Sequence, residues 1–256
     1  MLKTLKNILY ILKCYINNND YGLMINPTYN EDGLITWHIN SFLNDNRFIK
    51  AYKLGKATNS WGEEKELHWR AYVACWAADH VCDLEGDFIE CGVNRGGLAR
   101  MIIDYIDFEK LAKTFFLIDT FEGIPSETIT DEEKEYGVNV KHYGDVYEEV
   151  TDRFKIFNNV KLIKGKVPDT LVKVKSDKVA YLSLDMNVAG PEIAAAEYFW
   201  DKMVVGGIML MDDYGYSKKY TVSNRLFNEF AEKRSVKVLP LATGQGIIIK
   251  PPQKQI

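Results

Sequence analysis

A glycine-rich turn at residues 90–97 is the first segment of this chain that could bind a ligand. It reads ECGVNRGG, and it lies between the strand-like run DFIECGV and the helix-like run GGLARMIIDYI. Glycine lets the backbone turn tightly and approach a ligand, because no Cβ stands between them. The start of the following helix offers free N–H groups and the positive end of the helix dipole. The segment therefore predicts a site for a small ligand that carries a carboxylate or a phosphate.

Asp119 supplies the second signal, because it ends the next strand-like run, FFLIDTF, 23 residues beyond Gly96. An acid at this place can accept hydrogen bonds from both hydroxyls of a ribose. Dinucleotide-binding turns read GxGxxG, whereas this turn reads ExGxxxGG, and its spacing and leading Glu90 favour S-adenosylmethionine over NAD. We expect Glu90 to orient the turn or the methionine end of the cofactor. The full set of expected cofactor contacts is Glu90, Gly92, Gly96, Gly97, Asp119, Thr120, Gly165 and Asp185.

Three further acids stand at the ends of two later strand-like runs. Asp185 ends SLDM, and Asp212 and Asp213 end GGIMLMDD. If these strands are neighbours, the carboxylates converge and repel one another, and a bound cation would relieve the repulsion. Oxygen ligands suit a hard ion, Mg²⁺ before Ca²⁺, and Asn187 could add an oxygen or hold a bound water. The alternative is that the Asp pair caps the next helix or lies in solvent.

The expected chemistry follows from such a cation. It would bind two neighbouring oxygens of a substrate, such as a vicinal diol, and would lower the pKa of one hydroxyl. A base would take the proton, and the oxygen would attack the sulfonium methyl group. The candidates for the base are His142, because histidine side chains in general suit proton transfer near neutral pH, and Asp185. A lone histidine is often structural or exposed, so both candidates remain open.

The elements that must position these residues alternate between short apolar runs and amphipathic stretches from residue 87 onward. This alternation predicts an α/β fold with a mostly parallel sheet, helices on both faces and a C-terminal antiparallel hairpin formed by VKVLPLA and GIIIKP. Ligands of such sheets bind beyond the carboxyl ends of the strands, where the candidate residues lie. We divide the chain into an N-terminal helical extension, 1–82, and a cofactor-binding domain, 83–256.

Within the extension, residues 2–16 carry leucine and isoleucine at helical spacing. We expect a helix that docks on the domain or on a second subunit, which makes a homodimer plausible. An interfacial membrane helix is the alternative, since the stretch is too short and too charged to span a bilayer. Residues 17–35 read as a loop and 36–82 as mainly helical, with Ser60 and Glu63 spaced as a helix-capping pair.

The composition belongs to a globular protein, with 256 residues, 46% of them hydrophobic, and a formal net charge of −4. The acidic balance argues against a nucleic-acid binder. No transmembrane segment or signal peptide is expected. The cysteines show no metal-type spacing and are expected to be reduced, in a cytoplasmic protein: Cys14, Cys75, Cys82 and Cys91.

Five motifs in order, GDFIECGVNRGG, FFLIDTFEGIP, KLIKGKVPDTL, LSLDMNV and GGIMLMDDYG, resemble the macrocin O-methyltransferase (TylF-like) family. The resemblance covers roughly residues 40 to 250. It implies a Rossmann-like class I methyltransferase fold, S-adenosylmethionine as donor and ribose binding at Asp119. It also implies Mg²⁺ or another divalent cation at Asp185, Asp212 and Asp213.

One motif departs from the family, which often reads LDGDxYxST where this chain reads LDMNVAGPE. Asn187 therefore replaces the second acid. We expect a sugar O-methyltransferase whose small-molecule acceptor is a glycan or a nucleotide-linked sugar, in bacterial surface-polysaccharide or natural-product biosynthesis. The alternatives are a small catechol-like or phenolic acceptor, a non-catalytic relative that keeps the fold, and a dehydrogenase.

Overall fold

The computed structural model describes residues 27–140, 142 and 144–252. The expected helix at residues 2–16 and Cys14 lie outside this part of the chain. Cys75, Cys82 and Cys91 are free thiols. No helix in the described ranges is long and apolar enough to cross a membrane.

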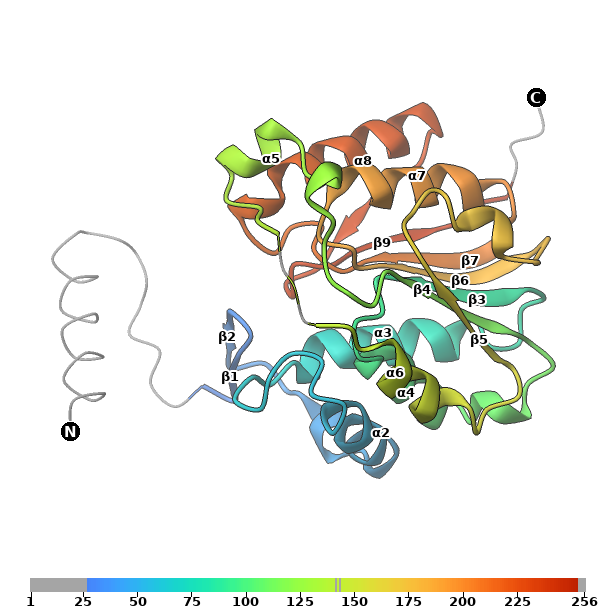
Figure 1. Cartoon of the computed structure of the whole chain (residues 1–256). Coiled ribbons are helices and arrows are strands. Elements are labelled where there is room, and N and C mark those ends of the chain that lie inside the picture. Colours follow the sequence, from blue (N-terminus) through green and yellow to red (C-terminus); the bar gives the residue numbers. More distant parts are fainter. Residues whose placement is uncertain (1–26, 141, 143, 253–256) are drawn as a thin grey trace, which may run out of the picture.

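A seven-stranded sheet forms the centre of the molecule, in the order β5-β4-β3-β6-β7-β9-β8 (Figure 1). The first five strands in this order are parallel, and β9 is antiparallel to both of its neighbours. This is the expected Rossmann-like arrangement with an antiparallel C-terminal end. The strands are β3 (Asp87–Cys91), β4 (Phe115–Asp119), β5 (Val160–Lys164), β6 (Val179–Leu184), β7 (Met203–Met211), β8 (Leu239–Pro240) and β9 (Gly246–Ile249).

The strand register brings the candidate residues to one edge of the sheet. Cys91 pairs with Ile118 on one side and with Leu184 on the other, and Leu184 pairs with Met211. The strands are apolar because both faces are covered, and β6 is buried along its whole length. The residues that follow these strand ends therefore start side by side.

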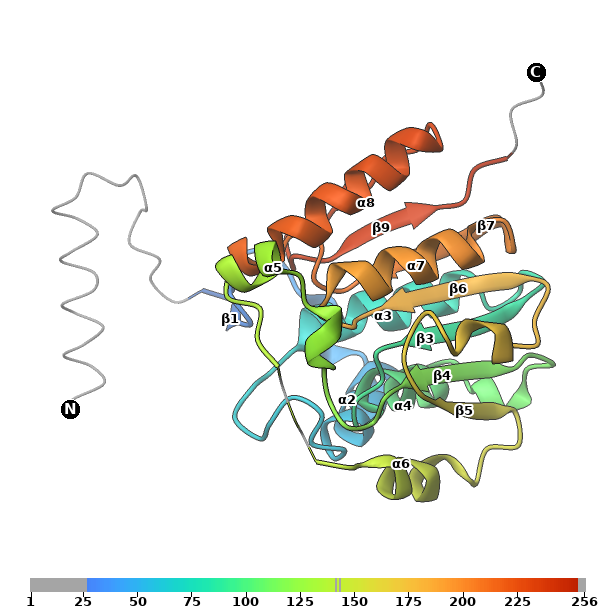
Figure 2. The ribbon, with the colours of Figure 1, turned by 45° about the horizontal axis from the view of Figure 1, so that its top comes forward.

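Helices cover both faces of the sheet, as the two views in Figures 1 and 2 show. One face carries α2 (Asn46–Lys56), α3 (His68–His80), α4 (Gly97–Tyr105) and α6 (Tyr147–Phe154). The other carries α5 (Asp131–Glu135), α7 (Ala189–Trp200) and α8 (Thr221–Lys233). Short 3-10 helices complete the described elements: η1 (Ser41–Asn44), η2 (Phe108–Lys110), η3 (Ser126–Thr128), η4 (Leu171–Lys173) and η5 (Lys218–Tyr220).

Two sequence expectations about local structure were wrong. Part of the expected loop 17–35 belongs to an antiparallel hairpin of β1 (Tyr29–Glu31) and β2 (Leu34–Thr36). Its turn at Asp32 and Gly33 has positive φ at both residues, which is a favoured geometry for a two-residue hairpin turn. The expected strand VKVLPLA reduces to β8, because only Leu239 and Pro240 pair with β9.

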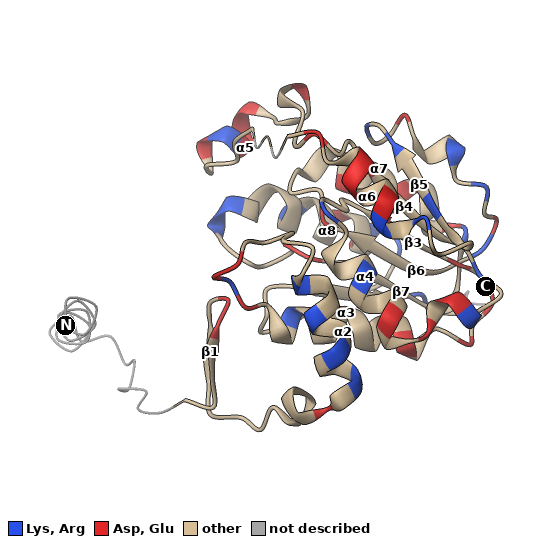
Figure 3. Ribbon diagram, turned by 60° about the horizontal axis from the view of Figure 1, so that its bottom comes forward, with Lys and Arg blue, Asp and Glu red and all other residues tan. Residues whose placement is uncertain are grey.

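The described part of the N-terminal extension packs into the main core. Residues of α2 and α3, such as Phe48 and Ala74, belong to the same buried cluster as Met101 of α4 and Phe88 of β3. Figure 3 shows basic and acidic residues interspersed on the helices and loops around this core. The division at residue 82 stays a prediction.

Candidate functional site

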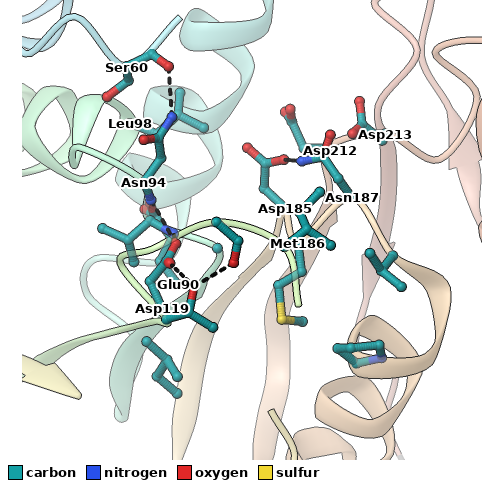
Figure 4. A pocket seen from close by; sticks show the side chains of 18 of the residues that line it. Ser60, Glu90, Asn94, Leu98, Asp119, Asp185, Met186, Asn187, Asp212 and Asp213 are labelled. Atoms are coloured by element: carbon teal, nitrogen blue, oxygen red, sulfur yellow. Dashed lines mark hydrogen bonds between the residues drawn. The ribbon is translucent and has the colours of Figure 1, made fainter. Parts of the chain in front are cut away.

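A cavity of about 420 Å³ opens at the carboxyl edge of the sheet. Figure 4 shows Glu90, Asn94 and Asp119 on one side of it and Asp185 and the Asp pair on the other. Most of the site residues predicted from the sequence line this one cavity: Glu90, Gly92, Gly97, Asp119, Thr120, Gly165, Asp185, Asp212 and Asp213. Gly96 is the neighbouring left-handed N-cap of α4.

Asp119 holds the glycine-rich turn in shape. Its Oδ2 accepts the backbone N–H groups of Val93 (2.6 Å) and Asn94 (2.7 Å), and its Oδ1 accepts the N–H of Phe121 (2.6 Å). Burial raises the pKa of Asp119, while these bonds favour its charged form. The hydroxyl of Thr120 is a fourth neighbour of this carboxylate, at Oδ1 (3.3 Å), so the described residues already occupy about the four acceptor positions of a carboxylate. A ribose hydroxyl would replace the longest of these contacts.

Gly92 is the point where the two sides of the cavity meet. Its φ is +95°, and a Cβ here would overlap the backbone carbonyl of Asp185. The backbone N–H of Asp185 donates to the carbonyl of Cys91 (2.8 Å). Glycine is therefore required both for the left-handed conformation and for the close approach of the two chain segments.

Ser60 caps a different helix from the one that its spacing to Glu63 suggested. The helix that follows in sequence, α3, begins only at His68. Instead, Ser60 Oγ accepts the backbone N–H of Gly97 (2.9 Å), at the start of α4, and the carbonyl of Ser60 accepts Nδ2 of Asn94 (2.8 Å). The loop before α3 thus closes over the glycine-rich turn.

The three acids converge as the strand order requires. Burial, and then the neighbouring Asp212 and Asp213, raise the pKa of Asp185 well above its ordinary value. Burial and Asp212 raise the pKa of Asp213 to about 6, against an opposing effect of Arg70. The repulsion expected from the sequence is therefore present in the folded chain.

Arg70, on α3, is a member of the site that the sequence analysis missed. It is 7% exposed, its Nη1 pairs with Asp212 and lies 3.5 Å from Asp213 Oδ1, and its Nε lies 3.2 Å from Asp32 Oδ2. Burial disfavours the charge of Arg70, but the acids around it outweigh this effect and raise its pKa. The available signal was an arginine among the apolar residues of HWRAYVACWAADH, where a charge needs a buried partner.

Gln245, which is fully buried, was also missed. Its Nε2 donates to Asp212 Oδ1 (2.9 Å) and to the backbone carbonyl of Arg70 (3.3 Å). Both oxygens of Asp212 therefore have a protein partner. The sequence around Gln245 did not indicate that it belongs to the site. Gln245 reaches Asp212 only through the antiparallel pairing of β9 with β7, whose residues are far apart in sequence.

Asn187 is engaged in a way that the sequence did not suggest. Its Nδ2 donates to Asp185 Oδ1 (3.1 Å), and its oxygen accepts the hydroxyl of Tyr220 (2.7 Å). Below it, Glu192 Oε1 accepts the backbone N–H groups of Met186 (3.1 Å) and Asn187 (3.0 Å). As placed, Asn187 orients Asp185 and does not offer a free oxygen.

The two candidate bases lie in different places. Asp185 lines the cavity. His142 is exposed, forms an isolated backbone bridge with Gly123 and is not among the residues that line the cavity. Of the two, only Asp185 is itself a lining residue, whereas His142 lies beside one, Gly123.

Unpaired polar atoms gather at this cavity. Eight buried side-chain nitrogen or oxygen atoms in the described residues lack a hydrogen-bond partner, and five of them belong to cavity residues. One of these five, Nε of Arg70, lies at ion-pair distance from Asp32, which leaves four without any partner in the described part of the chain. Buried polar groups are normally paired, so this concentration indicates a polar ligand. On the turn side the atoms are Glu90 Oε2, Asn94 Oδ1 and Trp61 Nε1.

The acids fit a hard divalent cation by their chemistry. They supply only oxygen donors, and Arg70 is the one guanidinium beside them among the cavity residues. In the side-chain positions of the described residues, no three carboxylate, imidazole or thiol groups surround a common point as metal ligands. In this structure Asp212 and Asp213 pair with Arg70 instead.

Comparison with known proteins links the chain to one family. The model of the family described as "Macrocin-O-methyltransferase (TylF)" matches residues 57–241. Mycinamicin III 3''-O-methyltransferase of Micromonospora griseorubida is 25% identical over 142 residues. That match covers 50% of this chain and 55% of the relative, so the chain aligns with about half of the relative's length.

Solved structures share the fold. The O-methyltransferase NovP is 21% identical, with a TM-score of 0.63 over 77% of this chain and 88% of NovP. The calicheamicin methyltransferase CalS11 is 14% identical, with a TM-score of 0.56 over 90% of this chain and 99% of that protein. Another structure of CalS11 is described as a TDP-rhamnose 3'-O-methyltransferase.

Proposed function

This chain belongs to the macrocin O-methyltransferase family, and we propose that it transfers a methyl group from S-adenosylmethionine to a sugar hydroxyl with the help of a divalent cation. The observation that carries the proposal is the single cavity in which the glycine-rich turn and the three acids meet. A methyl donor and an acceptor must lie within reach of each other for the reaction to occur.

The turn side has the features that S-adenosylmethionine requires. Glu90 Oε2 and Asn94 Oδ1 are unpaired acceptors for the ammonium and hydroxyl donors of such a cofactor, and Asp119 would hold the ribose. Burial raises the pKa of Glu90, and a cationic ligand beside it would favour its charged form. When bound, the cofactor supplies the activated methyl group.

On the acid side, Asp185, Asp212 and Asp213 would hold the cation, preferably Mg²⁺. When bound, the ion supplies a positive charge that makes a neighbouring hydroxyl more acidic. Asn187 fixes Oδ1 of Asp185. We assign the proton of the acceptor hydroxyl to Asp185, because this carboxylate lines the cavity whereas His142 is exposed.

A sugar is the acceptor that the relatives favour. The family name, and the names of mycinamicin III 3''-O-methyltransferase and TDP-rhamnose 3'-O-methyltransferase, support a glycosidic or nucleotide-linked sugar. We propose that the sugar belongs to a bacterial surface polysaccharide or to a natural product. A homo-oligomeric state and a cytoplasmic location stay predictions, and light scattering would measure the first of them.

Labelled methyl transfer tests the proposal directly. The full chain is incubated with labelled S-adenosylmethionine, Mg²⁺ and a panel of acceptors: TDP-rhamnose, neutral methyl glycosides, bacterial glycans and catechol. We expect label on a sugar. Label on catechol alone would favour the phenolic acceptor, and no transfer to any member would contradict the proposed function.

The role of the cation is tested separately. EDTA should abolish transfer, and added Mg²⁺ should restore it. Asp185→Ala and Asp213→Ala should lower kcat by at least about 100-fold and weaken Mn²⁺ binding measured by electron paramagnetic resonance. The control is Asp177→Ala, an exposed acid before β6, at the opposite end of the strand from Asp185. Full activity in EDTA would show that the cation is not needed.

A further inference from the structure

Arg70, a lining residue of the cavity, has a buried donor group that no described residue accepts. Its Nη1 faces Asp212 and Asp213, and its Nε pairs with Asp32. Its Nη2 has no hydrogen-bond partner among the described residues, although the side chain is 8% exposed and lines the cavity. A buried guanidinium N–H without an acceptor is costly, and an oxygen of a ligand would relieve that cost.

The guanidinium is held in place from several directions. The ring of Tyr216 lies 4.2 Å from Cζ of Arg70, and the hydroxyl of Tyr216 donates to Asp32 Oδ1 (2.8 Å). Gln245 joins the backbone of Arg70 to Asp212. Nη2 is therefore fixed before any ligand arrives, which lowers the entropic cost of binding.

The charge around Arg70 indicates what kind of oxygen it can receive. On the acid side of the cavity, the carboxylates of Asp32, Asp185, Asp212 and Asp213 surround this single guanidinium. The other charged residues of the lining are Lys65, Lys166, Glu90 and Asp119. With all four carboxylates of the acid side ionised, Arg70 and a divalent cation would together leave this group of charges with one net negative charge. A carboxylate or phosphate on the ligand would be repelled here, whereas a neutral hydroxyl or ether oxygen would not.

We propose that Arg70 is an acceptor-binding residue, whose Nη2 donates a hydrogen bond to an uncharged oxygen of the sugar ring beside the three acids. This inference rests on the proposed function and deepens it. The side chain would select neutral sugars over uronic acids at the ring that reacts. A phosphate of a nucleotide-linked sugar would lie away from Arg70.

Two substitutions separate the parts of this role. Arg70→Lys keeps a cation for Asp212 and Asp213 but has no second nitrogen to take the place of Nη2. Arg70→Met removes the cation as well. The matched control is Arg47→Lys, because Arg47 also pairs with an acid, Asp79, and stacks on an aromatic ring but does not line the cavity.

The probes are methyl α-rhamnoside and methyl glucuronoside, titrated calorimetrically into the full chain saturated with S-adenosylhomocysteine and Mg²⁺. We expect the wild-type protein to bind the rhamnoside in preference to the glucuronoside. Arg70→Lys should weaken rhamnoside binding by about 10- to 100-fold, raise KM for the acceptor more than it lowers kcat, and leave the affinity for S-adenosylmethionine unchanged. Arg47→Lys should bind like the wild type.

Three results would overturn the inference: wild-type affinity in Arg70→Lys, a preference of the wild type for the glucuronoside, or binding of neither probe by the wild type. A purely structural role would lower the affinities for cofactor and acceptor together, which also contradicts it. Failure of the proposed function is distinguished by labelled methyl transfer. If the wild type methylates a sugar and Arg70→Lys does so with the same KM, only the role of Arg70 is wrong.

Discussion

The two sides of the cavity are built from different parts of the chain. The turn side uses mainly the glycines and backbone N–H groups of residues 90–97, organised by one carboxylate, that of Asp119. Ser60, from an earlier loop, adds one side-chain contact. The acid side uses charged side chains from segments as distant as Asp32, Arg70 and Asp213. The comparison shows that a site made of local backbone can be predicted from a motif, whereas a site made of distant charges depends on partners that no motif contains.

The largest expected effect is at Gly92, where the two sides touch. Gly92→Ala would force a side chain into a left-handed conformation and into the carbonyl of Asp185, so we expect a loss of about 4 kcal/mol in unfolding free energy. Urea denaturation measures it. The control is Gly190→Ala in α7, where a Cβ has open space and the change should stay below about 1 kcal/mol. A stable Gly92→Ala protein would show that the two sides can separate without cost.

The next effect compares one acid from each side. Asp212→Asn removes a negative charge that pairs with Arg70 and places an amide N–H against another donor, Arg70 or Gln245. We therefore expect the free energy of unfolding to fall by about 3 kcal/mol. Asp119→Asn keeps one oxygen for neutral backbone donors and should cost about 1 kcal/mol. Equal losses, measured by urea denaturation of both variants, would mean that the acid side is no more dependent on charge than the turn side.

Glu192, below the acid side, gives a pH-dependent effect. Burial and then Asp213 raise its pKa from 4.5 to about 8, so the folded chain binds more protons than the unfolded chain between these values. The contribution of this group to stability is therefore complete below about pH 4.5 and is lost as the pH rises through about 8.

Glu192→Gln should remove that part of the pH dependence, because the amide keeps an oxygen for the N–H groups of Met186 and Asn187. We expect the variant to be the more stable protein by a few kcal/mol at alkaline pH. Urea denaturation across the pH range checks this, with the exposed Glu148→Gln as control. Parallel curves for wild type and Glu192→Gln would place the titration elsewhere.

The smallest expected effect concerns the loop over the cofactor turn. Ser60→Ala removes the acceptor for the N–H of Gly97 and should cost about 1 kcal/mol, the usual value for a helix cap, with weaker binding of S-adenosylmethionine by calorimetry. Thr130→Ala removes the corresponding cap of α5, away from the turn, and should cost as much stability without a change in cofactor affinity. A loss of affinity in both variants would indicate a general loosening of the fold.

Most of the fold was predictable, because β3, β4, β6, β7 and β9 each contain a short apolar run, and helix-like stretches follow β3, β6 and β7. The sequence did not predict the full strand order. It predicted only that the strands before Asp185 and before Asp212 and Asp213 are neighbours, and β6 and β7 do lie side by side. The turn around Gly92 was predictable because its geometry depends on residues that are close in sequence and on Asp119 at the end of the next strand.

The rest depended on contacts between distant segments. The hairpin at Asp32 was hidden in a polar stretch that reads as a loop, and Ser60 caps a helix at Gly97, 37 positions away in sequence. Arg70 and Gln245 carry no local pattern that names their partners. Sequence reasoning therefore found the acids and the need to balance their charge, but not the arginine that balances part of it.

The tie between Asp32, Arg70 and Gln245 has a consequence for how the chain becomes functional. Asp32 and Gln245 stand 213 positions apart, and contacts across such long spans form only after much of the chain has lost its freedom. The turn side, by contrast, is assembled from neighbouring segments. A partly folded chain would thus present a cofactor turn with no acceptor wall beside it, and the proposed reaction would begin only when the last long-range contacts have closed.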